Sequence, residues 1–153
     1  MKLKITLLVL IIVLLTPTLT GCFSCNSMNL ASKYESGQRI DLTLDNFHEF
    51  ITLKAKNLEA TKKSGLYTGI AFKYISDGLS EFSYFNVEII VEVTTEALTD
   101  AGTYKEIVFT QVMFLDEAGE AEVRDTYKFG TSFRNLKELS WRVVKITGYV
   151  VKK

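Results

Sequence analysis

The chain has 153 residues, a length that fits one domain or one domain with a tail. Eighteen Lys and Arg balance 18 Asp and Glu, and the chain holds one His, one Trp, one Pro and two Cys. The low counts of Cys and Pro exclude a disulfide-rich scaffold and a Pro-rich linker protein. The chain lacks the excess of basic residues that a nucleic-acid binder carries. A single His leaves little for a His-based metal site or catalytic triad.

The first 21 residues are typical of an export signal. Lys2 and Lys4 form a short basic start, and the apolar run from Ile5 to Leu15 follows. This run is about half of the roughly 20 residues that a membrane-spanning helix needs, which is the length of a signal-peptide core. Pro17 ends the expected helix just before small residues. We therefore expect residues 1–21 to be a helical signal peptide.

The signal ends in Leu19-Thr20-Gly21-Cys22. This motif resembles the lipobox of bacterial lipoproteins, a Leu, two small residues and a Cys. The resemblance implies cleavage before Cys22 and a diacylglycerol on its thiol, which would anchor the protein in the bilayer at the extracytoplasmic face of the cell membrane. The alternative is an uncleaved N-terminal anchor with Cys22 as an ordinary thiol, and it also places the domain outside the cytoplasm.

The second cysteine, Cys25, makes a Cys-x-x-Cys pattern with Cys22. A redox or zinc site needs both thiols or a second Cys pair, and lipidation would consume Cys22. We expect Cys25 to be a free thiol or a second acylated cysteine, and we expect no cofactor. Two acyl chains on Cys22 are enough for stable anchoring.

The chain then changes from a polar tether to a β-rich domain. Residues 22–38 are rich in Ser and Asn without periodicity, which predicts a flexible tether. From residue 39 to residue 153, apolar and polar residues alternate with period two in seven segments, which indicates half-buried strands. The segments are Arg39–Leu44, Ile51–Leu58, Tyr67–Ile75, Tyr84–Thr95, Tyr104–Leu115, Ala121–Phe129 and Trp141–Val151.

Seven short strands without a long amphipathic helix predict an all-β fold, an antiparallel immunoglobulin-like or fibronectin-like sandwich. In the cleanest segment, Val87, Ile89, Val91 and Val93 are expected to point inward. The segment from Tyr104 to Leu115 is apolar on both faces, which predicts a central strand.

Two local features interrupt the strands. The inward set shifts by one residue after Val143, which predicts a β-bulge in the last strand. Before the second strand, Asp45 or Thr43 can cap a one-turn helix, whose Phe47 and Phe50 are expected to close one end of the sandwich.

The segment around this short helix, DLTLDNFHEFITLKAKN, spans residues 41–57. It resembles a segment of uncharacterised extracellular and lipoprotein domains of Gram-positive bacteria of the Firmicutes type, in which a strand "LT" leads through an "xNF" turn into a strand "ITLK". The likeness extends over residues 39–95, and it implies a fold and a location but no activity.

Candidate sites for chemistry are few. His48 and Glu49 are adjacent and do not share a helix face, so we expect His48 to be a solvent-facing side chain. Asp116, Glu117, Glu120 and Glu122 surround a turn without the spacing of a calcium loop, and we expect a solvated turn rather than a metal site.

An aromatic stretch lies around the loop from Ser76 to Phe82. Exposed aromatic residues bind sugars in some sandwiches, although a core would fill the same positions. The candidate ligand-binding residues are Asp77, Phe82 and Tyr84.

These patterns predict a non-catalytic, membrane-anchored lipoprotein that binds or scaffolds an envelope protein or glycan and binds no nucleic acid. An alternative is an accessory or inhibitory domain that docks on an envelope hydrolase or transporter. A third alternative, a hydrolase built on Glu88, Glu92, Asp116 and Glu120, requires two of these carboxyl groups to converge in a cleft.

Overall fold

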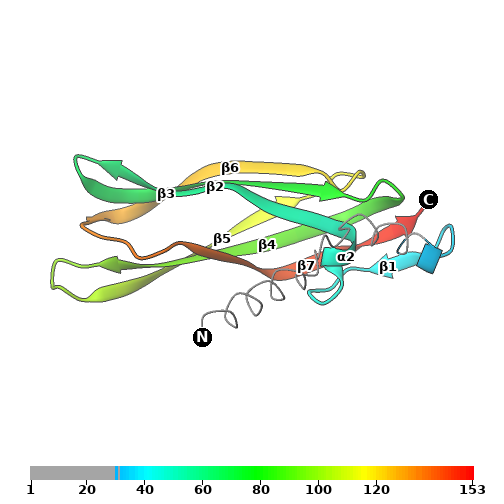
Figure 1. The fold of residues 1–153 in the computed structure, drawn as a ribbon, viewed down its shortest axis with the longest axis horizontal. Coiled ribbons are helices and arrows are strands. Elements are labelled where there is room, and N and C mark those ends of the chain that lie inside the picture. Colours follow the sequence, from blue (N-terminus) through cyan, green and yellow to red (C-terminus); the bar gives the residue numbers. More distant parts are fainter. Residues whose placement is uncertain (1–29, 31) are drawn as a thin grey trace, which may run out of the picture.

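The computed structural model describes Leu30 and residues 32–153, which form two antiparallel sheets. The signal peptide, the lipobox with Cys22, and Cys25 lie outside the described residues. One sheet has the order β1-β7-β4-β5, and the other has the order β2-β3-β6. Figure 1 shows the strands running along the long axis of the molecule in two layers. The strands are β1 (Arg39–Asp41), β2 (Ile51–Lys63), β3 (Leu66–Gly78), β4 (Phe82–Leu98), β5 (Tyr104–Phe114), β6 (Ala121–Phe133) and β7 (Ser140–Lys152).

The predicted sandwich of seven strands with one short helix is confirmed. An immunoglobulin constant domain also divides seven strands into four and three, but it joins its first strand to its second and its second to its fifth. Here β2 and β3 pair as a hairpin in one sheet, and β4 and β5 pair as a hairpin in the other. The two folds therefore share the layers and differ in strand order.

The core lies between the layers and follows from the alternation in β4. Val87, Ile89, Val91 and Val93 are at most 1% exposed, as the sequence predicts. Aromatic residues join the two sheets, and Phe72 of β3 packs on Phe109 of β5 with ring centroids 5.7 Å apart. Burial of these side chains is the main favourable term for a sandwich of this size.

Two irregularities bend the pairing of β4 with β7. The register shifts between Ile90, which faces Lys145, and Val91, which faces Val143, so Val144 is the extra residue. This shift confirms the bulge predicted from the change of phase. At the second shift, Asn86 and Val87 of β4 stand opposite the single residue Gly148 of β7. Asn86 (φ 51°) and Gly148 (φ 101°) both have positive φ.

The prediction that Tyr104–Leu115 forms a central strand is wrong, because β5 is an edge strand that pairs with β4 alone. The apolar residues on its two faces have different surroundings. Phe109 and Met113 point into the core, whereas Val108 and Phe114 point outward and are 46% and 70% exposed.

The predicted helix is present as α2 (Phe47–Phe50), but neither Asp45 nor Thr43 caps it with its side chain. The N-cap is Asn46, whose side chain bonds backwards along the chain: its Oδ1 accepts from Thr43 N–H at 2.8 Å. Phe50 is buried as expected, and Phe47 is half-buried. Among the described residues, no helix has the length and apolar character needed to cross a membrane.

Candidate functional site

Two of the three predicted ligand-binding residues belong to the core. Phe82 is 0% exposed and Tyr84 is 2% exposed, so neither has a surface with which to contact a ligand. The expectation that they bind a ligand is therefore corrected. Both side chains point inward from β4, and their aromatic rings pack in the core. Asp77, at the end of β3, is exposed.

Tyr84 holds the end of the sandwich together. Its hydroxyl donates to the carbonyl of Phe50 at 2.6 Å and accepts from the N–H of Leu79 at 2.6 Å. Its ring lies so close to Gly78 that a Cβ there would stand 2.6 Å from it. The loop that the sequence suggested as a ligand platform is thus tied to α2 and to the start of β2. Burial raises the pKa of Tyr84 to about 12.

Three of the four acidic residues at the turn between β5 and β6 line a small hollow with Asp77, namely Asp116, Glu120 and Glu122. The Oδ1 of Asp116 is already used within the turn, because it accepts hydrogen bonds from the N–H groups of Ala118 and Glu120, both at 2.9 Å. Glu122 pairs with Lys73 at 2.9 Å. Across the described residues, no three His, Cys, Asp or Glu side chains are placed to hold a metal ion.

The other two candidate carboxylates lie elsewhere. Glu92 and Glu88 stand on the outer face of β4, opposite Arg142 and beside Lys145 of β7. The ion pairs measure 2.8 Å for Glu92–Arg142 and 4.0 Å for Glu88–Lys145. Glu92 borders a different hollow from the one that Asp116 and Glu120 line.

His48 is solvent-exposed, as the sequence predicts. Its ring packs edge-on against Phe47. Its neighbour Glu49 pairs with Lys33 at 3.6 Å rather than with the imidazole.

A groove of about 580 Å³ lies between the edges of the two sheets. β1 pairs with only the last part of β7, through Tyr149–Val151, so the earlier part of β7 faces β2 across an open seam. We call this hollow the seam groove. Its apolar lining is Leu44, Phe47, Ile51, Leu53, Trp141 and Val143.

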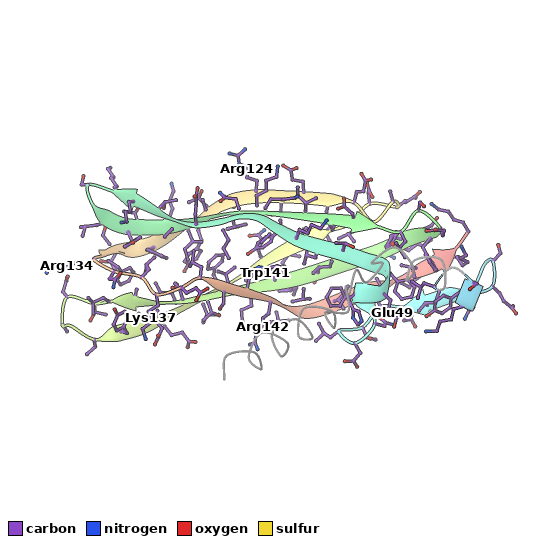
Figure 2. The ribbon with its side chains drawn as sticks, in the orientation of Figure 1. Glu49, Arg124, Arg134, Lys137, Trp141 and Arg142 are labelled. Atoms are coloured by element: carbon purple, nitrogen blue, oxygen red, sulfur yellow. The ribbon has the colours of Figure 1, made fainter. Side chains whose placement is uncertain are left out.

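The polar groups of the seam groove are neutral or basic. They come from His48, Thr52 and Arg142, and no carboxylate belongs to its lining. Figure 2 shows Trp141 between the two layers and Arg142, the next residue of β7, on the other side of the strand. An apolar hollow with a few polar groups at its rim is the usual composition of a ligand-binding site.

The ring of Trp141 packs on the ring of Tyr74 of β3, with ring centroids 5.5 Å apart. Tyr74 is 0% exposed, and its hydroxyl has no hydrogen-bond partner. Burial raises the pKa of Tyr74 to about 12, so the phenol stays neutral. The indole of Trp141 therefore packs on a buried, uncharged aromatic ring.

Reasoning from the sequence missed the seam groove. Its residues come from 44–53 and 141–143, and strand alternation does not say which two edges lie together. The one available signal is that the chain's single tryptophan stands beside the predicted bulge.

The sequence matches no protein-family model and is similar to no curated protein.

Proposed function

We propose that this protein is a lipoprotein of a bacterial cell envelope, anchored outside the cytoplasmic membrane through Cys22, and that its sandwich binds a ligand in the seam groove. The motif Leu19-Thr20-Gly21-Cys22 after an export signal supports the anchor. The groove with Trp141 supports binding, because it is an open hollow of about 580 Å³ with a mostly apolar lining.

The composition of the groove favours a ligand with apolar surface and an acidic group. Trp141, Phe47 and Leu44 offer flat or apolar contacts on which a sugar ring or an apolar side chain can pack. His48 at the rim offers an imidazole N–H to a carboxylate, whereas the guanidinium of Arg142 is already paired with Glu92 on the outer face of the sheet. Cell-wall glycan that carries peptide stems has both features and lies where the anchor would place the domain.

The experiment uses Trp141 as its reporter, because the chain has one tryptophan and that residue lines the groove. Full-length protein in detergent is titrated with disaccharide-peptide fragments of a Gram-positive cell wall, and tryptophan emission is recorded. We expect a saturable change in emission.

Two leucines provide a matched pair of variants. Leu44, 47% exposed, lines the groove, whereas Leu66, 39% exposed, begins β3 at the β2–β3 hairpin. Leu44→Glu places an acid in the groove and should abolish the emission change, while Leu66→Glu should respond as the wild type does. A wild type without response, or a Leu44→Glu variant that still responds, would contradict the proposal. Equal urea midpoints check that both variants fold.

A further inference from the structure

The four sheet edges of the described chain differ in how they are protected from pairing. An edge strand presents unpaired N–H and C=O groups, and proteins block such edges with charges, bulges or short strands. β1 has three residues, of which Arg39 and Asp41 pair with each other. The free part of β7 carries Arg142, Lys145 and a bulge.

The edges of the other sheet are also blocked. β2 carries Lys54, Lys56 and Glu59 and has a register shift between Ala55 and Asn57. β6 carries charges along the middle of the strand: Glu122, Arg124, Asp125 and Lys128.

β5 has none of these devices between its charged start and its end. Residues 107–115 (IVFTQVMFL) are nine consecutive uncharged residues without Pro, and the pairing with β4 runs without a register shift. On its outer face, Val108, Val112 and Phe114 are 46%, 36% and 70% exposed. A long, flat, apolar edge strand is a template for another strand.

The free backbone groups of β5 can be assigned from two hydrogen bonds. Leu115 N–H donates to the carbonyl of Val87 in β4, so the odd-numbered residues of β5 face β4. The even-numbered residues therefore direct their N–H and C=O groups away from the sheet. The side chain of Gln111 is consistent with this assignment, since its Nε2 donates to the carbonyl of the next residue, Val112, at 3.3 Å.

We propose that β5 pairs antiparallel with β5 of a second copy, with Thr110 at the two-fold axis, to join the two four-stranded sheets into one. In this register Val108 faces Val112 of the other copy and Ile107 faces Met113. Glu106 faces Phe114, so no like charges stand opposite each other. Centring the pair one residue later, on Gln111, places Glu106 opposite Asp116, which is unfavourable.

A second copy fits this edge better than an unlimited series of strands. Each molecule offers one unprotected edge, and a two-fold contact uses that edge of both molecules. The other edges of both molecules are blocked by charged residues, by a bulge or by the short length of β1. The assembly therefore closes as a dimer.

The test is disulfide cross-linking of the full-length chain in its membrane. The background variant Cys25→Ser removes the thiol that lipidation of Cys22 does not use, and it is oxidised alone to show the level without an added cysteine. Thr110→Cys is then compared with Thr126→Cys, since both threonines are exposed and lie on edge strands, β5 and β6, each of which pairs on one side only. We expect a disulfide-linked product of twice the chain mass from Thr110→Cys and none from Thr126→Cys.

A second substitution tests whether the edge itself makes the contact. Val112→Lys adds a charge to the outer face of β5, where the side chain is already 36% exposed and faces solvent. In the Thr110→Cys chain it should reduce the dimer to the level of Thr126→Cys. With the thiols reduced and the protein diluted until it is monomeric, it should leave the urea midpoint unchanged. A Thr110→Cys chain that cross-links no better than Thr126→Cys, a dimer that survives Val112→Lys, or a product with a different protein would overturn the proposal.

Discussion

Two buried tyrosines of the sandwich, Tyr84 and Tyr74, differ in how their hydroxyl groups are satisfied. The hydroxyl of Tyr84 makes two hydrogen bonds, to Phe50 and Leu79, whereas that of Tyr74 makes none. A buried polar group is costly when it is unpaired, so the same substitution should have different effects at these positions.

Tyr84→Phe should lower the free energy of unfolding by about 1–2 kcal/mol, because it removes two buried hydrogen bonds, while the Leu79 N–H keeps its 3.2 Å bond to the Phe50 carbonyl. Tyr74→Phe should leave stability unchanged or raise it by up to about 1 kcal/mol, because it removes a hydroxyl that bonds nothing. Urea unfolding of both variants measures the difference. Equal losses would show that Tyr74 has a partner or that Tyr84 does not depend on its two bonds.

At the scale of elements, the register shift at Asn86 and Gly148, between β4 and β7, depends on the absence of a side chain at Gly148. Its φ of 101° is unfavourable for other residues, and a Cβ there would lie 2.6 Å from the carbonyl oxygen of Asn86. That oxygen is a backbone atom and cannot move aside as a flexible side chain would. Gly130 of β6, in contrast, has open space around the position of a Cβ.

Gly148→Ala should therefore destabilise the protein by about 2–4 kcal/mol, by strain at a special backbone conformation. Gly130→Ala should be neutral or stabilising by up to about 1 kcal/mol, because it restricts the unfolded chain without a clash. Thermal or urea unfolding compares the two. A Gly148→Ala variant as stable as Gly130→Ala would mean that the bulge relaxes without cost.

The strands themselves could be predicted because alternation is a local property. Val87 to Val93 repeat with period two, and the change of phase after Val143 marks an extra residue that the pairing with β4 contains. The position of β5 could not be predicted in this way. Val108 and Phe114 are as apolar as a second buried face would require, and only the sheet order shows that nothing in the described chain covers them.

At the scale of the whole molecule, the candidate site depends on which edges meet. Trp141 and Leu44 are about 100 residues apart in the sequence, and they share a groove because β1 leaves the first part of β7 uncovered. Apart from the position of the single tryptophan beside the predicted bulge, the sequence carries no sign of the groove. Phe82 and Tyr84 show the converse, since an aromatic-rich loop suggested a surface and the fold uses it as core.

The proposed lipid anchor depends on residues 19–22, and it sets the distance from the membrane at which we propose that the seam groove binds its ligand. We expect the protein extracted from its native membrane to begin at Cys22 and to carry a diacylglycerol on that thiol. The most direct test is mass spectrometry of the intact protein and of its N-terminal peptide. A mass that matches cleavage before Cys22 plus the lipid supports the account, whereas an unmodified chain that retains residues 1–21 contradicts it.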